Sequence, residues 1–246
     1  MNILIKLMSI VSLVIAPYIA VTGGEEGGCC EKGMVTEEII KCNINGQEYT
    51  CTSKEQCDSI MNANKKSIDE LVGAYEVDAA HSSIAFSVRN VVTDVKGSIQ
   101  IDSGYVNFQN TTGPKVYILM NMESINTQNS YRDGHLREKP ELFDVAKFKT
   151  AVFEATDVVK DEEAGAEFAY IAKGKLTMKG VTKDVDLYFN YVGAQVQDDD
   201  EHGKYNVAGF EARTAISRGE FNIGGGLTVG ENVQLNITVE AAQPVK

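Results

Sequence analysis

From residue 74 to the end of the chain, apolar and polar side chains alternate with a period of two. The alternation is clearest in the segments 84–89, 168–178, 185–191 and 233–240. Alternation of this length is typical of a β-strand with one face against an apolar core and one face in water. It predicts eight strands, at 82–90, 95–108, 114–126, 149–158, 167–180, 184–196, 204–217 and 231–241.

Several of the predicted strands are longer than ten residues, whereas the usual strand has about five or six. Long antiparallel strands with one apolar face can close into a barrel, which leaves no exposed sheet edge. A sandwich of two sheets fits the same periodicity, so the pattern alone leaves both architectures open. The stretch 129–147 has no strand character, and we expect it to contain a short helix that crosses an opening of the sheet.

Residues 1–23 have the pattern of a secretory signal peptide. A short start with one positive charge precedes the apolar run Leu7–Ala16, which would rise about 15 Å as a helix, half the hydrocarbon thickness of a bilayer. We expect cleavage after Ala20 or Gly23, no stable membrane span afterwards, and a periplasmic or secreted protein. A permanent anchor over Ile3–Val21 is the alternative.

Residues 24–73 form a segment that contains all the cysteines of the chain, Cys29, Cys30, Cys42, Cys51 and Cys57. In an oxidising compartment such a cluster favours disulfides, and an odd number leaves one thiol over. A zinc site is less favoured, because the spacings lack the close cysteine pairs of such sites. A redox role is the remaining alternative.

Local signals divide this segment further. The pair Asn45-Gly46 between short extended flanks predicts a β-hairpin. Ser53 followed by Gln56 resembles a capping box and predicts a helix that continues to about Asn64. The polar run 62–70 is typical of a tether.

The chain carries 23 Lys and Arg against 35 Asp and Glu, a formal net charge of −12. Nucleic-acid backbones are bound by clustered positive charge, so we expect no nucleic acid partner. The sequence contains no Gly-x-Ser-x-Gly, His-Glu-x-x-His, Walker A or dinucleotide-binding motif. We therefore expect a binding protein rather than an enzyme, with no catalytic residue and no required metal or cofactor.

Several separated blocks follow one another in the order of a known family. They are Tyr75–Val88, Ser124–Thr127, Arg132–Leu136, Leu142–Val145, Gly174–Val185, Gly209–Phe221 and Val233–Ile237. Over residues 74–243 the chain resembles the YceI-like family of lipid-binding proteins. The resemblance implies an all-β fold: an extended eight-stranded antiparallel lipocalin-like β-barrel with a short helical segment, here preceded by the small cysteine-containing region.

The resemblance also implies that the apolar bore takes a long amphiphile, of the polyisoprenoid, isoprenoid quinone or fatty-acyl classes. Inward positions of the predicted strands and two apolar residues of the 129–147 stretch are the candidate cavity residues. They are Ile84, Phe86, Val88, Leu119, Leu136, Phe143, Phe153, Leu176, Met178, Leu187, Phe189, Phe210, Ile216, Leu235 and Ile237.

Four polar residues are candidates for the rim that receives a lipid headgroup: His81, Arg132, Asp133 and His135. An arginine offers a fork of donors to a phosphate or a carbonyl group. Two structural alternatives stand beside this interpretation. His81 can belong to a turn in which Asp78 and Ser82 satisfy backbone donors, and Arg132 with Asp133 can form an ion pair and a helix cap.

Together these features predict an exported carrier that sequesters a long-chain amphiphile. A surface interaction module with a packed barrel is one alternative, and a lipid-modifying enzyme is another. The expected partner is a bound isoprenoid or fatty-acyl lipid, and a second copy of the chain is a further candidate.

Overall fold

The computed structural model describes residues 40–44, 47–63, 67–113, 115–163, 166–199 and 203–245. The predicted signal peptide, residues 1–23, lies outside the described residues, as do Cys29 and Cys30. No helix in the described ranges has the length and apolar character needed to cross a membrane.

The predicted hairpin and helix of the cysteine segment are both present. Their elements are β1 Ile40–Ile44, β2 Gln47–Cys51 and α1 Lys54–Ala63. The strands pair antiparallel, and Cys42 lies on β1 opposite Tyr49. At the start of α1, Ser53 Oγ accepts a hydrogen bond from the Gln56 amide at 3.2 Å, as the predicted cap requires. The Gln56 side chain turns back to the Thr52 amide at 2.7 Å.

One predicted disulfide is formed within this segment. Cys51 at the end of β2 is bonded to Cys57 in α1, and the two Cα atoms are 5.4 Å apart. Both cysteines are buried. The bond links the hairpin to its helix and closes a loop of only six residues in sequence separation.

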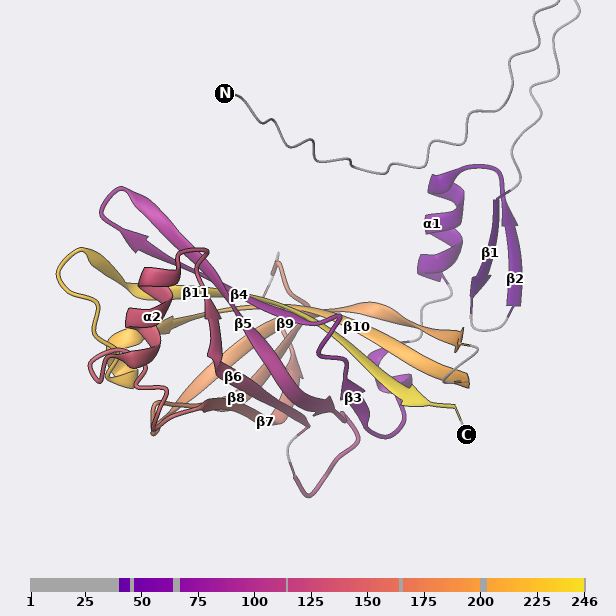
Figure 1. The fold of residues 1–246 in the computed structure, drawn as a ribbon. Helices are drawn as coiled ribbons and strands as arrows, with labels where there is room; N and C mark the ends of the chain where they lie inside the picture. Colours follow the sequence, from indigo (N-terminus) through magenta and orange to yellow (C-terminus); the bar gives the residue numbers. More distant parts are fainter. Residues whose placement is uncertain are drawn as a thin grey trace, which may run out of the picture. The chain divides into compact units, whose positions relative to one another are not determined.

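The rest of the chain is a ring of antiparallel strands (Figure 1). The strands are β3 Tyr75–Val77, β4 Ser83–Asn90, β5 Thr93–Val106, β6 Val116–Asn126, β7 Thr150–Lys160, β8 Tyr170–Met178, β9 Val181–Asp199, β10 Gly203–Ser217 and β11 Val229–Pro244. Each strand from β4 to β11 pairs with the next, and β11 pairs back onto β4, which closes the ring. The prediction of eight antiparallel strands is confirmed, and closure excludes the two-sheet sandwich.

The short strand β3 is the one addition to the predicted strands of the ring. It pairs with β5 and β11 beyond the point where β4 leaves them. The interior follows the alternation read from the sequence: on β6, Val116, Ile118, Met120 and Met122 are buried, whereas the residues between them are half-buried.

The tether prediction is wrong for its last residues. A 3-10 turn, η1 Ile68–Glu70, begins at Ser67 with a capping box in which Glu70 accepts from the Ser67 amide. Ile68 and Leu71 are buried in the hydrophobic core of the ring. They are three positions apart, so one turn of helix places both side chains on the same face, and the polar residues around them conceal this pair in the sequence.

The predicted helix within 129–147 is present as α2 Ser130–Glu138, which lies at one end of the ring (Figure 1). Its N-cap is Asn129, whose side chain accepts a hydrogen bond from the Arg132 amide at 3.0 Å. A second 3-10 turn, η2 Arg218–Phe221, follows β10 and leads into the loop before β11.

Candidate functional site

The interior of the ring holds two adjoining chambers. The deep chamber has a volume of about 80 Å³ and the outer chamber about 450 Å³. Four residues line both of them: Ile84, Met120, Leu176 and Leu235. The outer chamber alone lies within the range of about 300–1,000 Å³ that is usual for small-molecule sites.

The deep chamber is apolar. Of the residues that line it, only Thr214 has a polar side chain, and its hydroxyl donates to the Asp186 carbonyl at 2.9 Å. None of the lining residues is exposed. Aromatic rings pack together in it: the Phe189 ring stacks on Phe108 at a centroid distance of 6.1 Å and meets Phe210 at 6.3 Å. This chamber suits a hydrocarbon chain and offers nothing to a charged group.

The outer chamber combines an apolar wall with charged groups at one end. The charged or titratable residues of its lining are Arg132, His135, Lys139, Glu141 and Arg218. Lys139 and Glu141 are exposed, so this end of the chamber meets solvent. We call it the mouth: the part of the outer chamber lined by α2, by Lys139 and Glu141, and by the glycines 224–226.

Arg132 is held in place by the turn before α2. Its Nε donates to Thr127 Oγ1 at 2.7 Å, and its Nη2 donates to the Thr127 carbonyl at 2.9 Å. Arg132 also lines the outer chamber. A guanidinium has five N–H donors, so this anchoring leaves donors available to a group that enters the mouth.

Helical periodicity explains which residues of α2 reach the chamber. Arg132, His135, Leu136 and Lys139 are spaced i, i+3, i+4 and i+7 and all line the outer chamber. This spacing could have identified Lys139 from the sequence, although the prediction did not include it. Arg218, the second cation that the prediction missed, follows a strand predicted to end at 217 and donates to the carbonyls of Gly230, Ile223 and Val229.

Asp133 lies on a different face of α2 and does not line a chamber. It is buried, and it accepts hydrogen bonds from the Thr127 amide at 2.8 Å and from the Thr127 hydroxyl. Burial alone would raise the pKa of Asp133, but these hydrogen bonds, together with nearby Arg137 and Arg132, hold the pKa below its ordinary value. Its role is to fix the turn before α2, and the helix cap predicted for it belongs to Asn129.

Fourteen of the fifteen predicted cavity residues line one or both chambers. The exception is Leu119. Apolar residues occupy both faces of β6 at this point, but Ile118 and Met120 are buried and line the chambers, whereas Leu119 lies between them on the opposite face. The polar residue Asn121, two positions later, marks that face as the outer one.

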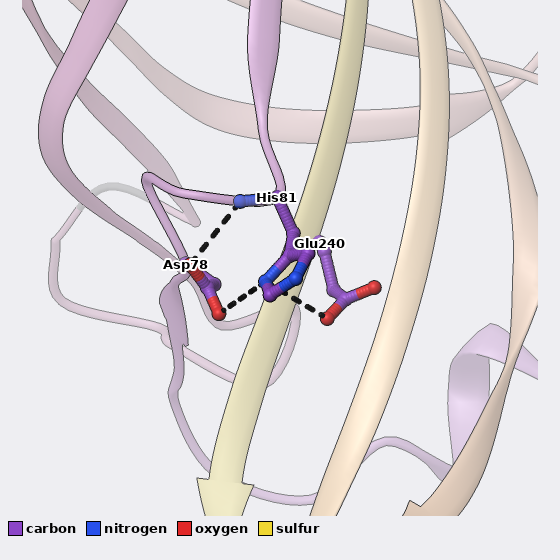
Figure 2. Close-up of side chains that lie close together, drawn as sticks. All are labelled: Asp78, His81 and Glu240. Atoms are coloured by element: carbon purple, nitrogen blue, oxygen red, sulfur yellow. Dashed lines mark hydrogen bonds and ion pairs between the residues drawn. The ribbon is translucent and has the colours of Figure 1, made fainter. Parts of the chain in front are cut away.

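His81 lies away from both chambers, on the turn between β3 and β4 (Figure 2). Its Nδ1 is 2.9 Å from Asp78 Oδ2 and 3.9 Å from Glu240 Oε1. Asp78 Oδ1 also accepts from the Ala80 amide at 2.8 Å, and the Ser82 hydroxyl bonds to the Glu240 backbone. His81 therefore belongs to a turn stabilised by Asp78 and Ser82, the structural alternative given above, and this cluster joins the β3–β4 turn to β11.

The same cluster perturbs two pKa values. The hydrogen bond to Asp78 raises the pKa of His81 above its ordinary value, and the charges of Asp78 and Glu240 raise it further. The hydrogen bond from His81 in turn lowers the pKa of Asp78. The ligand atoms of Asp78, His81 and Glu240 lie within 4.8 Å of one another, but the hydrogen bonds within the turn already account for this geometry.

Comparison with known proteins places the ring in one family. The model of the YceI-like domain matches residues 75–241. The UPF0312 protein of Yersinia pestis is 34% identical over 180 residues, which cover 69% of this chain and 86% of that protein.

One solved structure supports the fold of the ring. The crystal structure of BcnA from Burkholderia cenocepacia has a TM-score of 0.50 at 19% identity, covering 67% of this chain and 99% of that chain. A polyisoprenoid binding domain from Saccharophagus degradans has a TM-score of 0.46 at 18% identity, covering 69% and 98%. From the family match over most of the ring and the similarity to its Yersinia relative, the chain belongs to the YceI-like family.

Proposed function

We propose that this chain is an exported carrier that holds one long-chain amphiphile, with the apolar chain inside the ring and the headgroup at the mouth. Polyisoprenoids, isoprenoid quinones and fatty-acyl lipids are the ligand classes that fit. The observation that carries the proposal is the polarity of the interior: the deep chamber is apolar, and the cations of the lining stand only in the outer chamber.

The energetics of burial support binding without any catalytic group. Each methylene transferred from water to an apolar site contributes about 0.8 kcal/mol. Ten buried carbons therefore give on the order of 8 kcal/mol before the costs of ordering and association are subtracted. This is enough for a carrier, which must also release its ligand.

The mouth determines which headgroup is favoured. Arg132 and Lys139 contribute positive charge to the lining, and Glu141 contributes one negative charge. Lys139 has no ion-pair partner among the described residues, whereas the Arg218 guanidinium bonds to three backbone carbonyls and lies 3.5 Å from Glu231. A carboxylate or phosphate headgroup is therefore favoured over a cationic one.

A chain-length series tests this proposal. Saturated fatty acids of increasing length are titrated into the protein after its organic-solvent extraction and refolding, and the dissociation constant of each is measured by calorimetry. We expect the affinity to rise several-fold with each pair of methylenes and then to level off when the chambers are filled. An interaction module with a packed interior would bind none of the series, and that result would refute a carrier of fatty-acyl lipids.

A further inference from the structure

The apolar side chains most exposed to solvent gather at one end of the ring. Among the described residues, the four large apolar side chains with the greatest exposure are Leu227 (107%), Val92 (80%), Tyr131 (75%) and Val91 (66%). They lie on the turn between β4 and β5, on the loop before β11 and on α2. These elements project from the same end of the ring (Figure 1).

The two loops touch one another. The Val91 amide donates to the Thr228 carbonyl at 3.0 Å, and Val229 lies opposite Asn90 in the register of β11 and β4. Leu227 directly precedes Thr228, so Val91, Val92 and Leu227 form one group, which we call the apolar tips. Tyr131 lies on α2, where its ring packs on His135 of the chamber lining at a centroid distance of 4.2 Å.

The local backbone does not explain the valines. Asn90 and Thr93 are paired, so Val91 and Val92 make a two-residue turn, and Val91 has a φ of 55°. Glycine or asparagine is favoured in that region of backbone space, and a β-branched residue is disfavoured there. An aliphatic side chain at this exposed position destabilises the fold, so its presence indicates a role in an interaction with another molecule.

The apolar tips continue the lining of the outer chamber. Val88 and Val229 both line it, and they stand three and two residues from Val91 and Leu227. The tips thus begin within three residues of the chamber lining on both β4 and β11, beside the mouth. Arg89, Asn90 and Thr228 are the polar residues between the lining and the tips.

Two arginines beside the tips are paired with carboxylates. Arg89 Nε lies 3.2 Å from Asp94, and Arg218 lies 3.5 Å from Glu231. The chain as a whole has a net charge of −12, so two copies repel one another and an anionic surface is not attracted over long range. The partner that fits is a lipid surface, where an apolar interior lies beneath a polar layer. Aliphatic and tyrosine side chains insert shallowly into such a surface.

We propose that the apolar tips and Tyr131 dock the mouth onto the surface of a phospholipid bilayer, so that a lipid passes between the bilayer and the chamber without crossing water. This inference rests on the proposed carrier function. Docking itself needs no bound lipid, and it is therefore measured separately from ligand binding.

Flotation with vesicles of phosphatidylcholine and phosphatidylethanolamine tests docking. The purified chain is compared with the Val92→Asp/Leu227→Asp double variant and with Val72→Asp. Val72 is a matched control, since it is 64% exposed and precedes β3, which pairs with the opposite end of β5. We expect the double variant to lose on the order of ten-fold or more in vesicle affinity, because two aliphatic insertions are replaced by charges, and Val72→Asp to keep wild-type affinity at all salt concentrations.

Transfer of a fluorescent long-chain fatty acid from protein to the same vesicles gives the second measurement. We expect a wild-type rate that rises with vesicle concentration, and a double variant that binds the probe normally but transfers it about ten-fold more slowly. Equal flotation of all three proteins, with a transfer rate independent of vesicle concentration, would overturn docking and leave the carrier function standing. A wild-type dimer that the double substitution makes monomeric would assign the tips to a second copy instead, and failure of every protein to bind the probe would refute the carrier while flotation still decides docking.

Discussion

Gly97 lies directly opposite Phe86 in the register of β4 and β5, and a Cβ atom at position 97 would collide with the end of the Phe86 ring. The same Cβ atom would come within 2.7 Å of the Asn126 carbonyl oxygen. Phe86 is part of the outer chamber wall. Because Gly97 has no side chain, the phenyl ring of Phe86 can pack over it, and this position determines how far Phe86 extends into the outer chamber.

Replacing Gly97 with alanine should destabilise the protein by about 1–3 kcal/mol, because either Phe86 or the β5–β6 backbone must shift. Phe86 would move into the outer chamber and weaken binding of long fatty acids more than short ones. Urea unfolding and the chain-length series measure the two effects. Gly134→Ala on α2 is the control: a Cβ atom there meets nothing within 4 Å, and helix propensity predicts a gain of up to about 1 kcal/mol.

Arg132 should select among ligands by their headgroups. We expect Arg132→Ala to weaken a fatty acid by roughly ten-fold, the value of one charge-assisted hydrogen bond, and to leave a hydrocarbon of equal length unaffected. Arg132→Lys keeps the charge and should recover part of the loss. Because Arg132 also bonds to Thr127, the unfolding midpoint is measured in parallel. Equal loss for the acid and the hydrocarbon would remove Arg132 from the headgroup role.

The His81–Asp78 pair should make stability depend on pH on both sides of neutrality. The pKa of His81 is raised in the folded chain, so its contribution is complete below the ordinary histidine value of 6.5 and is lost as pH rises through the raised pKa. The pKa of Asp78 is lowered, so its contribution is present above the ordinary value of 3.8 and is lost as pH falls through the lowered pKa.

Urea midpoints across the pH range check this linkage. His81→Gln should flatten the decline on the alkaline side, whereas fatty acid binding should be unchanged, since His81 lines neither chamber. If His81→Gln binds the fatty acid more weakly while its unfolding midpoint stays at the wild-type value, His81 takes part in headgroup binding, and the structural role given to it is wrong.

Reduction of the Cys51–Cys57 bond should affect the hairpin and α1 alone. The closed loop is short, so the chain-entropy model gives a contribution of about 2 kcal/mol to that segment. We expect Cys51→Ser with Cys57→Ser to raise amide hydrogen exchange in residues 47–63 and to leave fatty acid affinity unchanged. A change in affinity would show that this segment takes part in binding.

The strands of the ring could be predicted from the sequence because each buries one face, and the resulting period of two is a local signal. Where both faces are apolar, as at Leu119, alternation no longer identifies the inner face, and the prediction for Leu119 was wrong although the polar Asn121 marks its face as the outer one. Ile68 and Leu71 were missed for a related reason: one helical turn is too short to show a period.

The mouth was only partly predictable. Arg132 and His135 are charged or titratable residues within a recognisable motif. Adjacent helix positions are rotated by about 100°, so Asp133 faces away from the chamber and has a structural role instead. Arg218 and the glycines 224–226 reach the chamber through the path of a loop. No local pattern encodes such a path, since it depends on contacts such as the Gly224 amide donating to the Glu141 carbonyl at 2.7 Å.

The central claim is that the interior of the ring holds a lipid chain, and mass spectrometry of organic extracts from natively purified protein tests it most directly. Val88→Trp places an indole ring in the outer chamber and narrows it, whereas Ser87→Trp adds the same indole one residue away, on the other face of β4. The account predicts close to one lipid per chain in the wild type and in Ser87→Trp, and little in Val88→Trp. Extracts with no lipid in the wild type, or with equal lipid in all three folded proteins, would contradict it.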